Sequence, residues 1–395
     1  MTVQMSKLGV ICEINPRLPR QHGLKDDSEV SFVPMAAVSE VSGTIESATL
    51  RRYAEVKKGY TAFSDADVLF AKITPCMENG KAALASGLAG GRGFGSTEFH
   101  VLRARRSVLP EWIYYFVRRE TFRREAKRNF TGTAGQQRVP TSFLEEALIS
   151  VPPLEEQRRI VALLARAEGI VRLRREAEQK AAELIPAIFI DMFGDPAMNP
   201  KELPLRSVRE LVARFEGGKN LQAGSDGGTD FRILKVSAVT SGEYVETESK
   251  PTPNGYEPPQ NHVVREGDML FSRANTEELV GATAVVRATN GRTLLPDKLW
   301  RFVWAEPVEQ AFMHALFQSA QVRQDLGKLS SGTSASMRNI SQAKLFELRL
   351  PIPSLHQQRV FARRADAAQS IRSQQEVALA RATATFDALL SRAFG

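Results

Sequence analysis

Pro152-Pro153-Leu154-Glu155-Glu156-Gln157-Arg158 returns, little changed, as Pro353-Ser354-Leu355-His356-Gln357-Gln358-Arg359. The two copies lie 201 residues apart, and each opens a long stretch with a helical pattern. The first stretch closes with Phe193-Gly194 and the second with Phe394-Gly395, at the same offset of 201. The repeat therefore covers a whole long helix and not only its first turn.

The repeat also extends upstream of the two helices. Asp67-Val68-Leu69-Phe70 matches Asp268-Met269-Leu270-Phe271 at an offset of 201, and Gly132-Thr133-Ala134 matches Gly332-Thr333-Ser334 at an offset of 200. Solenoid repeats have periods of about 20–50 residues, far shorter than this one. The sequence therefore predicts a duplicated module in which a long helix follows a globular domain.

Composition points to a globular, basic protein. The 395 residues are 43% hydrophobic, which is enough for ordinary cores, and they carry a net charge of +8. The charge is uneven: residues 101–130 hold nine Lys and Arg against three Glu, whereas residues 301–330 hold three basic and three acidic residues. A basic chain favours a polyanion as its partner.

Several classes of protein are disfavoured. Cys12 and Cys76 are the only cysteines and the five His show no ligand spacing, so we expect neither a disulfide framework nor a metal site. No apolar stretch approaches the ~18 residues of a membrane span, and Met1–Lys7 has no apolar signal core. We therefore expect a cytoplasmic protein.

The expected fold is an α/β (α+β) tandem with a pseudo-two-fold internal repeat. Two mixed α/β domains, at residues 1–150 and 196–350, are each followed by a helical spacer, at residues 151–195 and 351–395. The two spacers are expected to form an antiparallel coiled coil that separates the domains. Apolar, β-branched runs predict strands, which are 30–38, 67–73, 98–102, 231–239, 268–271 and 299–304. Helical patterns at 110–128 and 309–326 predict equivalent helices, the first with Pro110 in its first turn.

The long helices are predicted to pair through a seam with alternating spacings of three and four residues. Pro186 is expected to kink the first helix. The second seam contains Gln375 and Thr385, so this helix is not expected to be stable alone. The main seam residues, expected to contact the other helix or a partner, are Ile160, Leu163, Ile170, Leu184, Ile188, Phe361, Ile371 and Leu389.

A convincing catalytic signature is missing from the sequence. Gly217-Gly218-Lys219 lacks the upstream spacing of a phosphate-binding loop, and Gly91–Gly95 does not fit a dinucleotide-binding fingerprint. Glu55-Val56-Lys57 and Glu248-Ser249-Lys250 resemble nuclease fragments, with Asp27 or Asp226 as an upstream acid, but such short patterns arise by chance. We therefore expect a chain that binds and does not catalyse, with no cofactor of its own.

DNA binding is easier to support from the residues. Lys and Arg supply affinity for phosphate, and Arg, Gln and Asn supply bidentate contacts to guanine and adenine. Lys72 and Arg273 occupy equivalent positions in the two copies, as do Arg138 and Arg338. The predicted DNA-binding residues are Arg51, Arg52, Lys72, Arg92, Gln136, Gln137, Arg138, Arg273, Asn275, Ser336 and Arg338.

With these features, the sequence resembles the specificity subunits of type I restriction–modification enzymes over its whole length. The most specific elements are residues 151–161 and the helix ending at residues 189–196. The second copy departs from the first at His356 and Gln357, where Glu155 and Glu156 stand.

The resemblance implies two target-recognition domains, each of which recognises half of a bipartite site on double-stranded DNA, with the coiled coil as a ruler between them. It also implies two modification subunits that methylate adenine with S-adenosylmethionine, and restriction subunits that use ATP and Mg, so these cofactors are expected on the partners. Three alternatives stay open at this point. They are a coiled-coil scaffold that binds DNA without sequence preference, a nuclease or methyltransferase fragment, and an orphan or regulatory specificity subunit.

Overall fold

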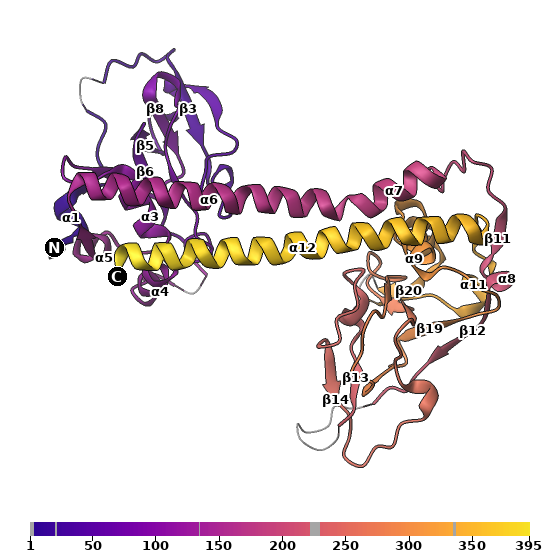
Figure 1. Ribbon diagram of the computed structural model, residues 1–395. Helices are drawn as coiled ribbons and strands as arrows, with labels where there is room; N and C mark the ends of the chain where they lie inside the picture. The colour runs from indigo at the N-terminus through magenta and orange to yellow at the C-terminus, as the bar shows by residue number, and fades with distance from the viewer. Residues whose placement is uncertain (1–3, 20–21, 134, 222–229, 335–336) are drawn as a thin grey trace. The chain divides into compact units, whose positions relative to one another are not determined.

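The computed structural model describes residues 4–19, 22–133, 135–221, 230–334 and 337–395. The chain folds into two compact units. Unit 1 is Met1–Glu176 with Val377–Gly395, and unit 2 is Ala177–Glu376. The long helices are shared between them: α6 (Leu154–Ala182) begins in unit 1, and α12 (Leu355–Phe394) begins in unit 2 (Figure 1).

Among its described residues, unit 1 contains two four-stranded sheets and a two-stranded ribbon. The first sheet is antiparallel, in the order β2 (Cys12–Ile14), β9 (Phe99–Ala104), β6 (Asp67–Ala71), β7 (Ala82–Leu84). The second has the order β4 (Thr49–Arg52), β3 (Glu29–Val33), β8 (Arg92–Gly95), β5 (Thr61–Ser64), and β3 and β8 are parallel. The ribbon pairs β1 (Gln4–Lys7) with β10 (Leu148–Val151).

Short helices cover these strands in unit 1. They are α1 (Leu8–Ile11), α2 (Tyr53–Val56), α3 (Pro110–Arg118), α4 (Glu120–Arg128) and α5 (Thr141–Glu146), with 3-10 turns η1 (Met35–Ala37) and η2 (Ala89–Gly91).

The repeated aspartate–apolar segment has a structural cause. Every residue of β6 is buried, and Asp67 at its start accepts hydrogen bonds from the Ser64 amide at 2.7 Å and from Arg103 at 2.7 and 2.8 Å. In unit 2, Asp268 likewise accepts from the Arg265 amide at 2.8 Å and from Arg301 at 2.9 Å. The carboxylate therefore closes the turn before a buried strand and anchors it to a neighbouring strand.

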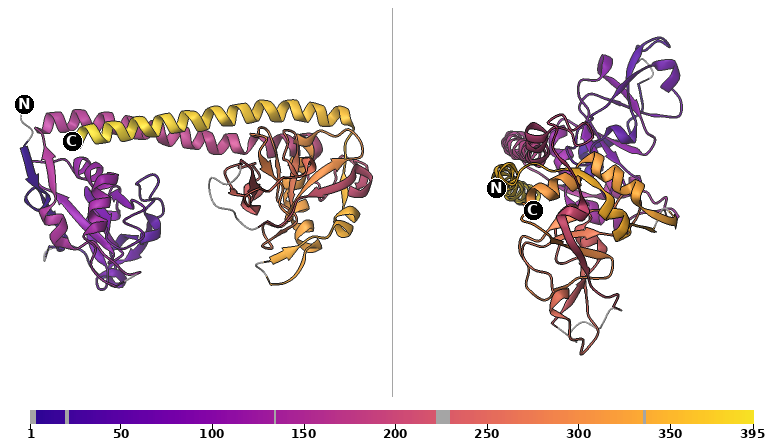
Figure 2. Two further views of the ribbon diagram at one scale, coloured as in Figure 1. Left: turned by 90° about the horizontal axis from the view of Figure 1, so that it is seen from below. Right: turned by 90° about the vertical axis from the view of Figure 1, so that its right-hand side faces the viewer.

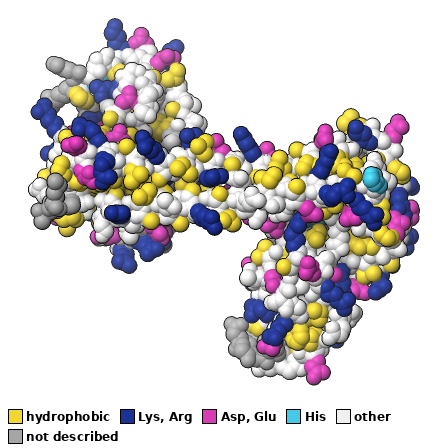
Figure 3. Space-filling view, viewed as in Figure 1, with side chains coloured by type: hydrophobic (Ala, Val, Ile, Leu, Met, Phe, Trp, Pro, Cys, Tyr) yellow, Lys and Arg dark blue, Asp and Glu magenta, His cyan; other side chains and the backbone are white. Residues whose placement is uncertain are grey.

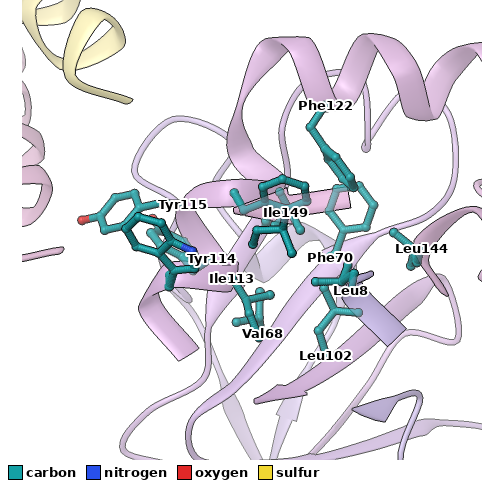
Figure 4. Close-up of a cluster of buried hydrophobic side chains, with 14 of the residues drawn as sticks. Leu8, Val68, Phe70, Leu102, Ile113, Tyr114, Tyr115, Phe122, Leu144 and Ile149 are labelled. Atoms are coloured by element: carbon teal, nitrogen blue, oxygen red, sulfur yellow. The ribbon is translucent and has the colours of Figure 1, made fainter. Parts of the chain in front are cut away.

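The main core of unit 1 lies between the β2-β9-β6-β7 sheet, α3 and the long helices (Figure 4). Trp112 on α3 donates to the Ser150 carbonyl at 2.9 Å, and its ring centroid lies 4.4 Å from that of Phe394 at the end of α12. The closing Phe-Gly of the second long helix therefore completes the core of the first unit.

Unit 2 has a comparable set of strands among its described residues. One sheet has the order β12 (Val212–Gly217), β19 (Leu299–Trp304), β15 (Met269–Ser272), β17 (Thr283–Val285). Two three-stranded sheets have the orders β14 (Ser249–Pro251), β13 (Arg232–Leu234), β18 (Thr293–Leu294) and β16 (Ala274–Asn275), β21 (Met337–Asn339), β20 (Ser331–Ser334). A ribbon pairs β11 (Leu205–Ser207) with β22 (Arg349–Pro351).

The helices of unit 2 also correspond to those of unit 1. They are α7 (Leu184–Phe193), α8 (Val208–Leu211), α9 (Gln310–Gln318), α10 (Ala320–Leu329) and α11 (Gln342–Glu347), with 3-10 turns η3 (Val236–Val239) and η4 (Gln260–His262). In the core, the Phe193 ring lies 5.1 Å from Phe312 and 5.8 Å from Phe361. Phe193 therefore closes unit 2 as Phe394 closes unit 1.

In each unit, the start of one long helix lies beside the end of the other. In unit 1 the start of α6 runs beside the end of α12 (Figures 1 and 2), and Leu164 of α6 shares a core cluster with Leu390 of α12. In unit 2, Phe189 of α7 lies 5.7 Å from Phe361 of α12, measured between ring centroids. Within each unit the two helices are therefore antiparallel, as predicted.

Several predicted elements are interrupted. The helix predicted at 110–128 breaks at Arg119, whose ψ is 136°, and its counterpart breaks at Ser319, whose ψ is 145°. Phe116 and Phe122 are six residues apart and would lie on different faces of a straight helix, whereas the break brings their rings to 4.8 Å. The interruption near Pro186 is confirmed, since α6 ends at Ala182 and α7 begins at Leu184.

Three predicted strands are shorter than expected, and the one predicted at 67–73 ends at Ala71. The strand at 30–38 ends at Val33, where Pro34 precedes η1, and only Arg232–Leu234 of the strand at 231–239 is extended before η3. A search of the described residues found no helix long and apolar enough to cross a membrane.

Candidate nucleic-acid interface

In unit 1, three predicted DNA-binding residues meet where β6 ends. The Lys72 amide donates to the Glu98 carbonyl at 2.9 Å, and the Lys72 carbonyl accepts from the Val139 amide at 2.9 Å. The Thr74 amide donates to the Gln137 carbonyl at 3.0 Å. These backbone bonds hold the segment 131–139 against residues 72–74, so Lys72, Gln137 and Arg138 come together on one surface.

Arg138 is fixed within this surface by a carboxylate. Its Nε and Nη2 both donate to the Glu98 carboxylate at 2.9 Å, and its Nη1 donates to the Gln136 carbonyl at 2.9 Å. The hydrogen bonds from Arg138 hold the pKa of Glu98 below its ordinary value. Most of the guanidinium is therefore engaged within the chain, and we interpret Arg138 as a residue that positions the 131–139 segment.

The polar side chains around Arg138 are less constrained. Among the described residues, no ion pair or side-chain hydrogen bond engages the ammonium of Lys72 or the amides of Gln136 and Gln137, and Gln136 is exposed. On this surface of unit 1, these groups are available to a phosphate or a base edge.

His100 supports this surface and was not predicted from the sequence. It is buried, with Nε2 at 2.8 Å from the Val139 carbonyl and Nδ1 at 3.1 Å from the Asn15 side-chain amide. Burial lowers its pKa, so the ring is neutral, and Nε2 must carry the proton that Val139 accepts. A lone histidine within a strand gives no sequence signal for this role.

The equivalent surface in unit 2 has the same backbone frame. The Arg273 amide donates to the Lys298 carbonyl at 3.1 Å, and the Arg273 carbonyl accepts from the Ile340 amide at 2.9 Å. Strands β16 and β21 then place Asn275 opposite Arg338. Arg273, Asn275 and Arg338 are therefore brought together as Lys72 and Arg138 are in unit 1.

The arginines of this second surface are also partly engaged. Arg338 pairs with Glu277 at 3.2 Å and donates to the Gly332 carbonyl at 3.3 Å, while its Nε is buried without a partner among the described residues. Arg273 donates from Nε to the Asp297 carbonyl at 2.8 Å. Ser336, also predicted to bind DNA, lies outside the described residues.

Arg51, Arg52 and Arg92 lie on a different sheet of unit 1. The Arg51 guanidinium stacks 3.8 Å from the centroid of the Phe32 ring, Arg52 is exposed, and Arg92 donates to the Ser64 hydroxyl at 2.5 Å. They belong to strands β4 and β8, and Arg92 shares the Ser64 hydroxyl with Arg103, which lies opposite Asp67 at the other end of the β6–β9 pair from Lys72. The structure therefore does not join them to the surface around Lys72.

Part of the basic stretch at 101–130 is engaged within unit 1. Arg118 pairs with Glu168, Arg124 with Glu120 and Lys127 with Glu78. Arg119 stacks on Phe116 and Phe394, and Arg123 donates to the Glu78 carbonyl. These five residues therefore contribute to the fold, and on the face shown in Figure 3 basic and acidic side chains are interspersed.

The seam predicted for the long helices needs a correction of about one residue. Leu163 is 45% exposed and Ile170 53%, whereas the next residues, Leu164 and Val171, are 1% and 8% exposed. Ile371 is exposed as well, while Phe361 is buried and Ile160, Leu184, Ile188 and Leu389 are partly buried. Leu164 lies in the core cluster of unit 1 together with Leu390 of α12, so packing of the domain against the helix sets the buried face.

The described residues contain no group of three or more His, Cys, Asp or Glu arranged to hold a metal ion. The two free cysteines lie in unit 1, and burial raises the pKa of the Cys12 thiol to about 12, so that thiol is neutral at physiological pH.

The chain is thus a tandem of two mixed α/β units. Each unit has an antiparallel pair of long helices and a polar surface at equivalent strand ends. Comparison with known proteins finds relatives with this organisation. Residues 1–183 match the family described as type I restriction modification DNA specificity domain. The EcoEI type I restriction enzyme specificity subunit of Escherichia coli is 28% identical over 88% of this chain and 74% of that protein. The EcoAI specificity subunit of E. coli is 40% identical over 38% of this chain and 25% of that protein.

Solved structures share the fold. A chain from a study of complex assembly and conformational transition of the type I R-M system has a TM-score of 0.61 at 21% identity, over 99% of this chain and 97% of that one. The S subunit of a type I restriction-modification system from M. genitalium has a TM-score of 0.57 at 12% identity, over 100% and 96% of the two chains. Over most of its length the chain is therefore similar to type I restriction enzyme specificity subunits, and residues 1–183 match their DNA specificity domain.

Proposed function

We propose that each unit recognises one half of a bipartite DNA site, and that the chain does so as the specificity subunit of a type I restriction–modification complex. The observation that carries this proposal is the equivalent surface in the two units. Lys72 with Arg138, and Arg273 with Arg338, sit on matching backbone frames although the residues around them differ. A shared frame with different side chains suits two half-sites of different sequence.

The side chains can be divided by the chemistry of their contacts. Lys72 has a free ammonium suited to a phosphate, and a point charge gives affinity without sequence preference. The amides of Gln136 and Gln137 suit the two hydrogen-bonding atoms that adenine presents in the major groove, and Asn275 has the same chemistry in unit 2. Arg138 and Arg338 act mainly by positioning their segments, with Ser336 as a further proposed contact. Arg51, Arg52 and Arg92 would then serve as additional phosphate contacts on unit 1.

The partners and cofactors follow from the same proposal. Two modification subunits and restriction subunits would bind this chain, and S-adenosylmethionine, ATP and Mg would bind to those partners. Support for a docking role of the long helices comes from Leu163, Ile170 and Ile371, which are large apolar side chains exposed to solvent. This chain would recognise DNA and would not itself catalyse methylation or cleavage.

The decisive experiment is co-expression with cognate modification subunits, followed by genome-wide mapping of methylated adenines. One bipartite motif with a fixed gap is expected. Exchanging Gln136 and Gln137 for Ala should change one half-site only. Salt-dependent binding without any methylated motif would instead favour a scaffold that binds DNA without sequence preference.

The ruler role of the helices has its own test. Deleting residues 173–179 together with the equivalent residues 374–380 removes two turns from each helix, which is about 10.5 Å at ~1.5 Å per residue. At ~3.4 Å per base pair, the gap between half-sites should shorten by about three base pairs, and the half-sites should stay the same. Deleting only one of the two segments is the control, because it disrupts the register of the pair. A changed half-site with an unchanged gap would contradict the ruler.

A further inference from the structure

Unit 2 contains a cavity of about 770 Å³. Its walls come from α7, α9, α12 and the turn at residues 241–244, with Phe189, Ala315 and Gln369 among the residues that face it. Protein interiors contain few voids larger than a water molecule, whereas ligand sites measure ~300–1,000 Å³. The size of this space is therefore that of a ligand site and not that of a packing defect.

The repeat shows what fills the same place in unit 1. Gln157 on α6 accepts from the Leu109 amide at 2.9 Å, and Gln358 on α12 accepts from the Glu309 amide at 3.1 Å. These matching bonds align the sequence of α3 with that of α9 at an offset of 200 residues. They align the sequence of α6 with that of α12 at an offset of 201 residues. Ala315 is therefore the counterpart of Tyr115.

The same alignment gives the unit 1 counterparts of the other residues around the cavity. His314 corresponds to Tyr114, Gln318 to Arg118 and Gln369 to Glu168. A nearby turn confirms the match, because Tyr114 donates to the Gly43 carbonyl at 3.3 Å and His314 hydrogen-bonds to the backbone of Gly242.

In unit 1 the chain fills this place with its own side chains. Tyr115 donates from its hydroxyl to Glu168 Oε2 at 3.0 Å, Tyr114 donates to Glu168 Oε1 at 3.2 Å, and Arg118 pairs with the same carboxylate. The Tyr115 ring lies at the edge of the core cluster with its hydroxyl pointing away from it (Figure 4). A phenol ring and its carboxylate acceptor therefore occupy the space.

In unit 2 each of these groups is smaller or uncharged. Replacement of the Tyr115 ring by the methyl group of Ala315 opens the space, and Gln318 turns aside to donate to the Thr283 carbonyl at 2.9 Å. Gln369 keeps a side-chain oxygen where Glu168 has a carboxylate, and its amide has no hydrogen-bond partner among the described residues. The cavity thus keeps an acceptor for a hydroxyl while it lacks the ring.

The charges around the cavity favour an uncharged occupant. Arg372 pairs with Glu243 at 2.7 Å and with Glu376 at 3.1 Å, and Arg287 lies 3.7 Å from Asp366. Asp195 at the rim accepts from the Ala197 amide at 2.9 Å. The guanidinium groups are therefore balanced by carboxylates of the same unit, and among the described residues that line the space no unpaired cation faces it.

We propose that this cavity binds a phenolic ring from outside the chain, either a free phenol or the tyrosine side chain of another polypeptide, in the place that Tyr115 fills in unit 1. The ring lies against Phe189, and the hydroxyl donates to the side-chain oxygen of Gln369. The duplicated chain therefore keeps one copy of the site closed by its own tyrosine and the other copy open.

Titration of the full-length chain with p-cresol, followed by saturation-transfer NMR and calorimetry, tests the proposal. Wild-type protein should bind p-cresol, and Ala315→Tyr, which installs the unit 1 residue, should weaken binding at least about tenfold. Binding of N-acetyltyrosinamide as well as p-cresol supports a tyrosine side chain as the source, whereas binding of p-cresol alone supports a free phenol. Failure of both to bind, or equal binding to wild type and Ala315→Tyr, overturns the proposal.

A second variant keeps the test decisive if Ala315→Tyr does not fold. Gln369→Leu should preserve binding of toluene and reduce the preference for p-cresol over toluene by about three- to tenfold, the effect of one lost hydrogen bond. Gln374→Leu, at an exposed position of the same helix, should leave that preference unchanged. An unchanged preference in Gln369→Leu contradicts the proposed orientation of the ring.

Discussion

Replacement of Gln157 or Gln358 by Leu tests why the repeated segment contains glutamine. Gln157 is fully buried, accepts from the Leu109 amide at 2.9 Å, and donates to the carbonyls of Pro152 at 2.8 Å and Ser107 at 3.1 Å. Gln358 accepts from the Glu309 amide at 3.1 Å and donates to the Pro353 carbonyl at 3.0 Å. Each glutamine thus joins the start of a long helix to the residue before α3 or α9.

The expected cost follows from the groups that leucine leaves without partners. A buried hydrogen-bonding group without a partner costs ~1–3 kcal/mol. Gln157→Leu abandons three such groups and should lower the free energy of unfolding by at least about 3 kcal/mol, whereas Gln358→Leu abandons two and should lower it by at least about 2 kcal/mol. These are large fractions of the ~5–15 kcal/mol that stabilises a typical domain.

Urea unfolding combined with hydrogen exchange measured by mass spectrometry separates the two units. Gln157→Leu should accelerate exchange in the peptide that contains Leu109, and Gln358→Leu should do so in the peptide that contains Glu309. Gln179→Leu is the control, because Gln179 is exposed on α6, and its effect should stay within about 0.5 kcal/mol. A loss below about 1 kcal/mol for Gln157→Leu, or faster exchange in the wrong unit, would refute the assigned role.

Three further predictions concern charge. Arg301 is 6% exposed and pairs with Glu216 and Asp268, so Arg301→Met should cost about 3–5 kcal/mol in urea unfolding, with exposed Arg214→Met as a near-neutral control. Burial lowers the pKa of His314 to about 4. As the pH falls below ~6.5, this histidine becomes protonated in the unfolded protein but stays neutral in the folded protein until pH ~4. The free energy of unfolding therefore decreases as the pH falls through this range. Relative to wild type, His314→Gln should gain about 2 kcal/mol in unfolding free energy between pH 7.5 and pH 5, and an unchanged difference would contradict the assignment. Lys72→Ala should reduce the slope of log affinity for DNA against log salt by about 0.9, whereas Arg124→Ala, which removes a residue paired with Glu120, should change it little.

The repeated segments could be identified from the sequence because each one has a local physical cause. Asp67 and Asp268 close a turn and anchor a strand, and Phe193 and Phe394 pack on α9 and α3. Where a structural role depends on one residue and its immediate neighbours, both copies of the repeat have the same residue at that position. The long helices and the strands at 67–73 and 299–304 were predicted from such local patterns, and the first of these strands ends at Ala71.

The interruptions and the exact contacts depended on tertiary packing. The break at Arg119 exists because the Phe122 ring must meet Phe116, and the apolar pattern of 110–128 is compatible with a straight helix as well. The seam is displaced because Leu164 packs against the core of unit 1 as well as against α12. Likewise, the carboxylate that fixes Arg138 comes from Glu98, 40 residues away, so the sequence alone gave no reason to separate Arg138 from Lys72.

Each unit contains the start of one long helix and the end of the other, which gives a physical reason for the duplication. Unit 1 takes the start of α6 through Gln157 and the end of α12 through Phe394, and unit 2 takes the start of α12 through Gln358 and the end of α7 through Phe193. In each unit, the core is therefore completed by the end of the long helix that follows the other globular domain in the sequence. Such reciprocal contacts are those of a self-complementary pair, in which residue i of one copy meets residue j of the other and the reverse contact also forms. A single chain that contains both modules keeps this reciprocity while its two recognition surfaces diverge, because the contacts that hold the pair together do not involve Lys72, Arg138 or their counterparts.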